Sequence, residues 1–385
     1  MSRPEPKSKR LLIFFYDLGI GGIQRRLVDV IEYLQSESEG KRVKVTLYIK
    51  SYSGNRHNQG YIERIEKSGA RIIYRPRWTA GPFRVGTLAH MIWTILKIRP
   101  DVILTYLRLL SVGIVFIRRM LWWKKIKVVL NEGILTSELL KDEVGKWSRN
   151  VWRQLMTWTY ARADRIIVPT VAVQKDLIDN FQIPTENISV AKHWTLLNNR
   201  TRTQQMGKDT FYNLIYIGRL EPQKNLGVLL TIVEALQKHQ SRLKACIVGT
   251  GSLENSLRQK ASDLRINRSI DFVGRQEDVL PYLSKSQIFI LTSRYEGMPV
   301  SVLEAKALGI PAVISNFPGS EEVVEDGKDG YIYKTSQEAI ERIYTLISDD
   351  DLRRKLGNYA RMRAEKEFGM STLARFCSYV VNSEG

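Results

Sequence analysis

The chain is poor in cysteine and histidine, which limits the chemistry that it can support. Its 385 residues include two cysteines, Cys246 and Cys377, and four histidines. Two cysteines cannot form a disulfide framework, so a reducing compartment is favoured and a disulfide-stabilised secreted domain is disfavoured. Neither cysteine lies in a pattern that is typical of a catalytic thiol.

Long apolar runs are also absent from the sequence. No stretch reaches the roughly 18 apolar residues that span a bilayer, because Arg108, Arg118 and Arg119 interrupt the best candidate. The basic N-terminus, MSRPEPKSKR, leads into an apolar segment without a small-residue cleavage pattern, so we expect a polar tail and no signal peptide. We therefore predict a cytoplasmic protein that is peripheral on the inner face of the cell membrane.

Acidic residues are scarce in the first half of the chain only. Residues 1–200 contain 34 lysines and arginines against 17 aspartates and glutamates, whereas the remaining residues contain 25 against 23. All eight tryptophans lie in this basic half, and the segments FIRRMLWWKKIK (116–127) and KWSRNVWRQLMTW (146–158) interleave aromatic with basic residues. The pattern favours contact with an anionic membrane surface over contact with nucleic acid. The alternative is that these are amphipathic helices with tryptophan in the core and arginine outside.

Short apolar runs alternate with helical patterns along the whole chain. The runs are continuous rather than alternating with polar residues, which is typical of parallel strands that are covered on both faces. We predict strands at 11–16, 43–49, 70–74, 101–106, 127–131, 165–169 and 188–192 in the first half, and at 212–218, 243–249, 269–274, 287–292, 311–315 and 330–333 in the second.

This alternation predicts an α/β fold with two doubly wound, Rossmann-like domains. The first domain spans residues 1–197 and the second spans 211–369. Between them lies the polar, aperiodic segment NNRTRTQQMGKDT at 198–210, which we interpret as a linker.

Ligands of open α/β sheets bind beyond the carboxyl ends of the strands, so the loops that follow strands carry the candidate site residues. After the first strand, Gly21 and Gly22 precede a predicted helix, where backbone amides can approach an oxyanion. The alternative is that they are turn glycines only. The second strand closes on Lys50 rather than on an acidic residue, which disfavours a nicotinamide-binding Rossmann enzyme.

Two loops of the second half point to phosphate binding. Arg219 and Lys224 follow the strand at 212–218 and precede a helix that begins near Asn225. Two cations and a helix N-terminus at one strand end form a site for two adjacent phosphates. The next strand is followed by Gly249 and Gly251, which supply either a second point of close approach or a tight turn.

The segment SRYEGMPVSVLEAKALGIPAVISNFPG, residues 293–319, places two glutamates around a predicted helix start at Pro299. The amides from Gly297 to Val300 can face an anion there. Glu304, inside the helix, can accept both hydroxyls of a ribose, and Glu296, in the loop, can accept hydroxyls of a hexose. The spacing therefore predicts a sugar-nucleotide site, although two glutamates eight residues apart are by themselves common on a solvated helix surface.

Taken together, GGIQR, GRLEPQKN, VGTGS, FVGR and EGMPVSVLEAKALGIPAV resemble the retaining glycosyltransferases of family 4, or group 1, whose signature is two glutamates separated by seven residues. The resemblance covers the second half almost completely and the first half mainly through GGIQR and the strand order. It implies a GT-B fold, in which two Rossmann-like domains face a cleft and the C-terminal domain holds most of the donor. It also implies that a C-terminal helix, 370–385, packs back on the first domain.

The resemblance assigns roles to individual residues. Arg219 and Lys224 would bind the donor diphosphate, Glu304 the ribose and Glu296 the transferred sugar. Backbone contacts to the donor would come from Gly22, Gly297, Met298, Pro299 and Val300, and the loop near Arg275 would cover the base. The implied reaction is metal-independent transfer with retention of configuration, in which the nucleotide sugar is a substrate and no cofactor takes part. The acidic triplet Asp349–Asp351 is accordingly interpreted as a helix N-cap and not as a metal site.

The sequence departs from the family at one position. Many relatives carry a histidine after the fifth strand of the first domain, whereas this chain has Gly133 there, and none of its four histidines is an obvious substitute. Two hypotheses follow: either Asn131 or Glu132 provides the polar contact to the substrate, or the transferred sugar differs.

The sequence therefore predicts transfer of a hexose or N-acetylhexosamine from a nucleotide diphosphate sugar, with UDP favoured over GDP, to a lipid-linked or surface-polysaccharide acceptor. A sugar-nucleotide epimerase on the same fold is the alternative, but it requires more acid and base groups than the motifs offer. A non-enzymatic basic surface-binding protein would explain the charge and leave the two glutamates and two cations without a role.

Overall fold

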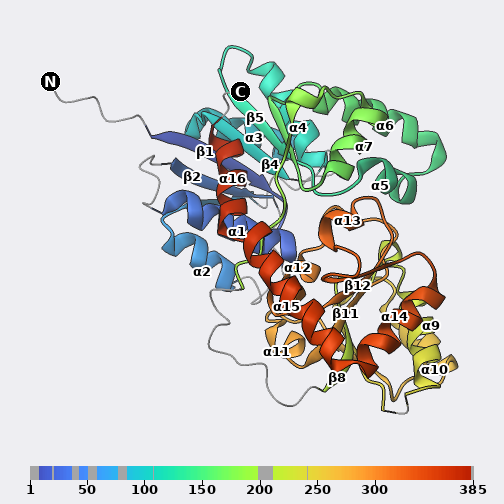
Figure 1. Cartoon of the computed structure of the whole chain (residues 1–385). Coiled ribbons are helices and arrows are strands. Elements are labelled where there is room, and N and C mark those ends of the chain that lie inside the picture. Colours follow the sequence, from blue (N-terminus) through green and yellow to red (C-terminus); the bar gives the residue numbers. More distant parts are fainter. Residues whose placement is uncertain are drawn as a thin grey trace. The chain divides into compact units, whose positions relative to one another are not determined.

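The computed structural model describes residues 8–19, 21–36, 43–50, 59–76, 85–106, 108–197, 211–240 and 242–382. They form two compact units (Figure 1). Unit 1 contains the chain up to Lys192 together with the segment from Leu373 onward, and unit 2 runs from His193 to Thr372. Residues 1–7 of the predicted polar tail MSRPEPKSKR and the predicted linker at 198–210 lie outside the described residues, and Lys9 and Arg10 of that tail belong to the first strand.

Unit 1 is built on a parallel sheet whose strand order is β3-β2-β1-β4-β5-β6-β7 (Figure 1). The strands are β1 (Lys9–Phe15), β2 (Val43–Ile49), β3 (Arg71–Tyr74), β4 (Val102–Tyr106), β5 (Lys127–Asn131), β6 (Arg165–Val168) and β7 (Ile188–Val190). The helices that connect them are α1 (Gly22–Gln35), α2 (Gln59–Lys67), α3 (Val85–Ile98), α4 (Arg108–Met120), α5 (Thr136–Glu143), α6 (Lys146–Tyr160) and α7 (Val171–Phe181), and a 3-10 turn, η4, covers Thr185–Asn187.

Unit 2 contains a second parallel sheet, with the order β10-β9-β8-β11-β12-β13. Its strands are β8 (Tyr212–Ile217), β9 (Ala245–Val248), β10 (Ile270–Gly274), β11 (Ser286–Leu291), β12 (Ala312–Ser315) and β13 (Gly330–Tyr333). Its helices are α9 (Leu226–Gln237), α10 (Glu254–Asp263), α11 (Leu280–Leu283), α12 (Val300–Ala307), α13 (Ser320–Val323), α14 (Ser336–Ser348) and α15 (Asp350–Glu367), with a 3-10 turn, η5, at Pro222–Lys224.

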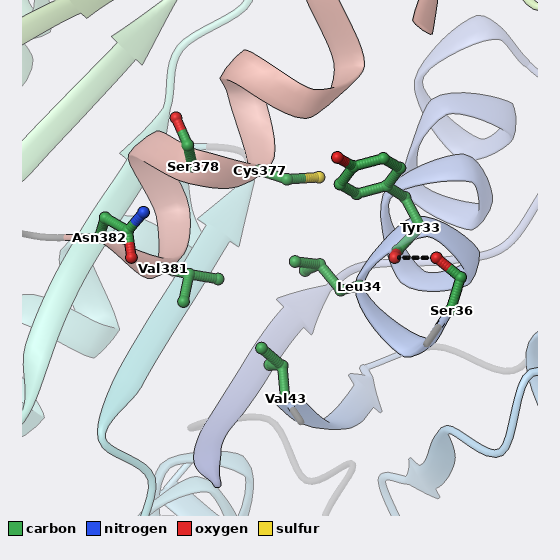
Figure 2. A pocket seen from close by; sticks show the side chains of 8 residues that line it. All are labelled: Tyr33, Leu34, Ser36, Val43, Cys377, Ser378, Val381 and Asn382. Carbon is green, nitrogen blue, oxygen red and sulfur yellow. Dashed lines mark hydrogen bonds between the residues drawn. The ribbon is translucent and has the colours of Figure 1, made fainter. Parts of the chain in front are cut away.

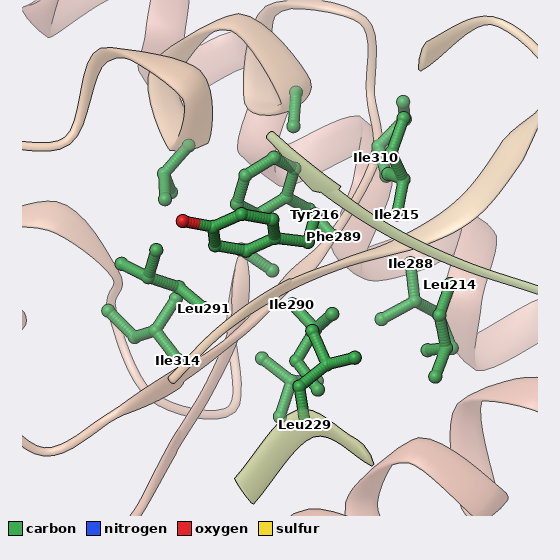
Figure 3. Packing of buried hydrophobic residues seen from close by; sticks show 14 of the residues in the cluster. Leu214, Ile215, Tyr216, Leu229, Ile288, Phe289, Ile290, Leu291, Ile310 and Ile314 are labelled. Atoms are coloured by element: carbon green, nitrogen blue, oxygen red, sulfur yellow. The ribbon is translucent and has the colours of Figure 1, made fainter. Parts of the chain in front are cut away.

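The strands of unit 2 are buried on both faces, as their continuous apolar sequences predict. Consecutive residues Leu214, Ile215 and Tyr216 of β8 are all fully buried, as are Ile288 and Phe289 of β11. Figure 3 shows these side chains packed together with neighbouring apolar residues of the same cluster. The predicted fold class, α/β with two doubly wound Rossmann-like domains, is confirmed.

The last described helix, α16 (Met370–Val381), contributes to unit 1 from Leu373 onward. Figure 2 shows Cys377 and Val381 of α16 around a small pocket with Leu34 of α1 and Val43 of β2. The Lys9 ammonium, on β1, donates a 3.0 Å hydrogen bond to the Val381 carbonyl. The end of α16 is therefore held in unit 1 by both apolar and polar contacts.

Helix α12, which follows the Glu296 loop, is held in unit 2 by a buried ionic cluster. The Lys306 ammonium lies 2.6 Å from Asp329 Oδ2 and donates a 2.7 Å hydrogen bond to the Val323 carbonyl. Arg363 of α15 reaches the same Asp329 oxygen at 2.9 Å. Lys306 and Asp329 are fully buried, and burial lowers the pKa of Lys306 to about 8. One carboxylate thus holds α12 to α15.

Replacing Asp329 by alanine should destabilise unit 2 by about 3–5 kcal/mol, because two buried cations would lose their shared counter-charge. A urea titration of the full-length variant should show a lower midpoint for the transition of this unit. Asp351→Ala, which removes an exposed ion pair to Arg354 on α15, is the control and should change the midpoint little. An unchanged midpoint in the Asp329 variant would contradict this account.

Candidate functional site

The predicted site residues of unit 2 lie at the point where its sheet reverses its winding. Strands β8, β9 and β10 follow one another toward one edge, and β11, β12 and β13 follow toward the other. The carboxyl ends of β8 and β11 are therefore neighbours at the topological switch point, where open α/β sheets bind ligands. Arg219 and Lys224 follow β8, and Glu296 follows β11.

Backbone-directed hydrogen bonds join the loops after these two strands. The Gln223 side chain donates to the Tyr295 carbonyl at 2.7 Å, and the Arg294 amide donates to the Gln223 carbonyl at 2.9 Å. The Thr292 hydroxyl donates to the Lys224 carbonyl at 2.8 Å. Each loop thus fixes the backbone of the other, and their side chains are presented at one place.

Lys224 and Glu296 meet as an ion pair, with a hydrogen bond from the ammonium to Glu296 Oε1. Their side chains are only 14% and 8% exposed, so water screens the pair poorly. The Ser293 hydroxyl donates a second hydrogen bond to the same carboxylate oxygen at 2.6 Å. The carboxylate is therefore held from two sides.

The Tyr216 phenol holds the backbone at Arg219. Its hydroxyl donates to the Arg219 carbonyl at 2.9 Å. Burial raises the pKa of Tyr216 well above its ordinary value, and the negative charge of Glu296 adds to this. The phenol thus stays protonated and keeps donating, while the Arg219 side chain is exposed.

The start of α12 differs from the prediction by one residue. The helix begins at Val300, and Pro299 is its N-cap, with no side-chain hydrogen bond capping the first turn. Gly297, Met298 and Pro299 are buried in the loop ahead of it. Glu304 lies in the second turn and is 6% exposed, so it is not on a solvated helix surface.

Gly249 and Gly251 allow the loop after β9 to approach the loop after β8. A Cβ atom at Gly249, whose φ is +142°, would lie 1.9 Å from the Gly218 carbonyl oxygen, and one at Gly251 would lie 2.4 Å from the Leu220 carbonyl oxygen. Ser252 donates to the Glu221 carboxylate from its amide and its hydroxyl, at 3.1 and 2.6 Å, and these bonds lower the pKa of Glu221. Both glycines are explained by backbone packing, and a ligand role for them stays a prediction.

Gly21 and Gly22 lie at the start of α1, and Arg275 follows β10. Gly21 is the N-cap of α1 with φ 174°, an extended conformation that any residue adopts, and Gly22 is the first helical residue. A positive-φ turn therefore does not account for Gly21. Arg275 follows Gly274, whose φ is +71°, and its side chain is exposed.

In unit 1, Glu132 is a buried carboxyl group at the carboxyl end of β5. The Tyr160 hydroxyl donates to Glu132 Oε2 at 2.6 Å and lies 2.9 Å from the Thr136 hydroxyl. Burial raises the pKa of Glu132. Asn131 is half-buried beside it, and a Cβ atom at Gly133 would meet no heavy atom of the described structure within 4 Å. The position of the missing family histidine thus has room for a side chain.

Two residues of the site were not predicted from the sequence. Ser293 donates a hydrogen bond to Glu296, and Tyr216 donates one to the Arg219 carbonyl. The signal for Ser293 was its position in the loop after a strand, three residues before Glu296, which is within hydrogen-bond reach.

Asp349 caps α15 as predicted, because its carboxylate accepts from the Leu352 amide at 2.8 Å. Within the described ranges no three histidine, cysteine, aspartate or glutamate residues gather as metal ligands.

Two family models match the chain, one in each half. The model described as Glycosyltransferase Family 4 matches residues 20–193, and the model described as Glycosyl transferases group 1 matches residues 199–363.

Curated relatives are similar to part of the chain. The amylovoran biosynthesis glycosyltransferase AmsD of Erwinia amylovora is 28% identical over 215 residues, which cover 54% of this chain and 59% of that protein. The GalNAc-α-(1→4)-GalNAc-α-(1→3)-diNAcBac-PP-undecaprenol α-1,4-N-acetyl-D-galactosaminyltransferase of Campylobacter jejuni is 29% identical over 162 residues, which cover 41% of this chain and 44% of that protein. The chain thus spans about half the length of the curated relatives that it matches.

Among solved structures, HepE of Anabaena in complex with UDP and glucose aligns with a TM-score of 0.78 and 16% identity, over 98% of this chain and 100% of that one. At this identity the likeness shows the fold, which is GT-B.

The raised pKa of Glu132 predicts a pH-dependent stability. A carboxyl group whose pKa is above its ordinary value of 4.5 contributes fully below that pH and loses its contribution as the pH rises through the raised value. Glu132→Gln keeps an oxygen that accepts from Tyr160 and carries no charge. The thermal midpoint of this variant should therefore rise relative to that of the wild type as the pH is raised above 4.5.

Glu138→Gln, at the surface ion pair with Lys141 on α5, controls for loss of a negative charge in the same region. A constant difference between Glu132→Gln and wild type across this pH range would refute the buried, proton-binding state of Glu132.

Proposed function

Because the chain belongs to the family 4, or group 1, glycosyltransferases, we propose that it transfers a hexose or N-acetylhexosamine from a nucleotide diphosphate sugar to a lipid-linked or surface-polysaccharide acceptor. The proposal includes retention of the anomeric configuration and independence from metal ions. UDP is favoured over GDP, in keeping with the UDP and glucose bound by HepE. The acceptor class is supported by the names of the Erwinia and Campylobacter relatives.

The observation that carries the proposal is the convergence of Lys224 and Glu296 at the switch point of the unit 2 sheet. An ammonium and a carboxylate held side by side can bind the two chemically different parts of a sugar nucleotide. The ammonium has three donors, so it can keep its bond to Glu296 while it binds a phosphate oxygen. The carboxylate, positioned by Ser293, accepts hydroxyl groups of the adjacent sugar.

The proposed chemistry follows from where charge develops. When the bond between the anomeric carbon and the diphosphate breaks, negative charge gathers on the departing diphosphate. Arg219, Lys224 and the N-terminus of α12, which carries no side-chain cap, stabilise that charge where it forms. Preorganised hydrogen-bond donors and positive groups that face developing negative charge contribute several kcal/mol. They supply the positive charge that a metal ion supplies in other transferases.

The acceptor side of the proposal depends on the surface of unit 1. Trp122, Trp123 and Trp147 are 80%, 57% and 99% exposed, so the alternative in which these tryptophans face the core is wrong for all three. Lys124 and Lys125 follow the tryptophan pair and are exposed too. None of the helices in the described part of the chain is long and apolar enough to cross a membrane.

Exposed indole rings beside cations suit an anionic bilayer surface. There, tryptophan rings lie at the level of the lipid headgroups, and lysine ammonium groups pair with lipid phosphates. We therefore propose that the protein lies at the inner face of the cell membrane and contacts it through unit 1, where lipid-linked acceptors are presented.

The proposed function is tested by donor and acceptor dependence. The purified chain is incubated with UDP-sugars and GDP-sugars, with and without a polyprenyl-diphosphate-linked saccharide, and release of nucleoside diphosphate and formation of product are followed. A glycosyltransferase requires the acceptor for rapid release and for product. Conversion of the donor sugar without acceptor would instead indicate an epimerase, and inertness toward all donors would remove the enzymatic proposal.

Lys224→Ala and Glu304→Ala should each lower turnover at least about a hundredfold. The first change removes positive charge from the departing diphosphate, and the second removes the acceptor of the ribose hydroxyls. Initial rates with saturating donor measure both effects. Lys238→Ala, which removes an exposed cation at the end of α9, is the matched control. Turnover within a few-fold of wild type in either site variant would exclude the assigned role.

Trp122→Ala combined with Trp123→Ala should weaken binding to vesicles containing anionic lipid by at least about tenfold, because two interfacial rings are lost. Co-flotation at low salt measures the binding. Met362→Ala, at an exposed apolar side chain of α15 in unit 2, is the control and should bind like wild type. Equal binding to neutral and anionic vesicles, or wild-type binding by the double variant, would contradict the proposed surface.

A further inference from the structure

His193 contacts the loop that precedes α12 through both its backbone and its ring. Its amide donates to the Met298 sulfur at 3.1 Å, and its Nδ1 atom lies 2.7 Å from the Met298 carbonyl oxygen. Both residues are buried, at 6% and 3% exposure. Because a carbonyl oxygen only accepts hydrogen bonds, Nδ1 carries the proton in this contact.

Met298 is thus held at two points, at its side chain and at its carbonyl group. Its carbonyl belongs to the peptide plane that leads into Pro299, the N-cap of α12. Fixing that plane limits rotation of the backbone on both sides of it, because each residue has only two soft dihedral angles. The amides of Gly297 and Met298 on one side, and of Val300 on the other, are those that are predicted to contact the donor.

The segment that carries His193 is itself firmly held in unit 2. Trp194 is 1% exposed, and the Thr195 amide donates a 2.7 Å hydrogen bond to the Phe368 carbonyl. Phe368 is fully buried, and its ring lies 5.1 Å from the Lys306 ammonium of the ionic cluster. The imidazole therefore projects from a rigid support onto the loop.

We propose that His193 is a positioning residue for donor binding: its Nδ1 proton fixes the Met298 carbonyl and thereby orients the amides at the start of α12 toward the donor phosphates. This inference rests on the proposed function for its donor. A buried histidine that served packing alone would tolerate any side chain of similar volume, whereas this role requires a donor at the position of Nδ1.

Two amide side chains separate these cases. In His193→Asn the side-chain nitrogen is as many bonds from Cα as Nδ1 is, so it can donate to the Met298 carbonyl. In His193→Gln the amide is one bond farther out and corresponds to Nε2. His193→Leu fills the space without a donor, and His239→Leu, at an exposed histidine of unit 2, controls for loss of an imidazole.

The first measurement is steady-state kinetics with varied nucleotide sugar. His193→Leu and His193→Gln should raise KM for the donor about tenfold, as expected for loss of one buried hydrogen bond, while His193→Asn should stay within about threefold of wild type. His239→Leu should match wild type. Equal KM in the Leu, Gln and Asn variants would overturn the proposal, and so would a uniform loss that follows thermal stability.

The second measurement needs no nucleotide and so separates this inference from the proposed function. Amide hydrogen exchange of peptides covering residues 296–303 should be faster in His193→Leu and His193→Gln than in His193→Asn and wild type. If the wild type uses no nucleotide sugar, the proposed function fails while exchange still reports on the Met298 contact. Unchanged exchange in His193→Leu would refute the positioning role.

Discussion

The ion pair between Lys224 and Glu296 is the interaction around which the candidate site is organised. Both groups are largely buried, so each would be an uncompensated charge without the other. The pair forms only because the carboxyl ends of β8 and β11 are neighbours, and because Gln223 and Thr292 fix the two loops against each other. Sheet topology, loop hydrogen bonds and site electrostatics therefore depend on one another, and a change in any of them moves the others.

Strand positions could be predicted from the sequence because parallel strands covered on both faces leave a continuous apolar run, and β2, β5 and β13 match their predicted ranges residue for residue. The contact between Lys224 and Glu296 could not be predicted in the same way. The two residues are 72 positions apart in the chain, and the family resemblance assigns them to different parts of the donor, the diphosphate and the transferred sugar. Side-chain pairing between loops depends on rotamers and on strand order, which periodicity does not encode.

Lys306 illustrates a different limit of sequence reasoning. A lysine in the middle of VSVLEAKALG is expected to reach solvent, yet it is fully buried because Asp329 and the Val323 carbonyl satisfy it. His193 was likewise set aside, because no motif surrounds it and its partner Met298 lies in another loop. In both cases the polar residue is explained by a partner that only the folded chain brings close.

Unit 1 is completed by a segment that follows unit 2 in the sequence. Cys377 and Val381 cover apolar side chains of α1 and β2, which emerge early, whereas residues 193–372 are contiguous. Unit 2 can therefore finish folding while unit 1 still lacks α16, which reverses the usual N-terminal-first order of domain folding. Until α16 is synthesised, the apolar side chains of α1 and β2 that it covers stay exposed, and chaperones can bind them.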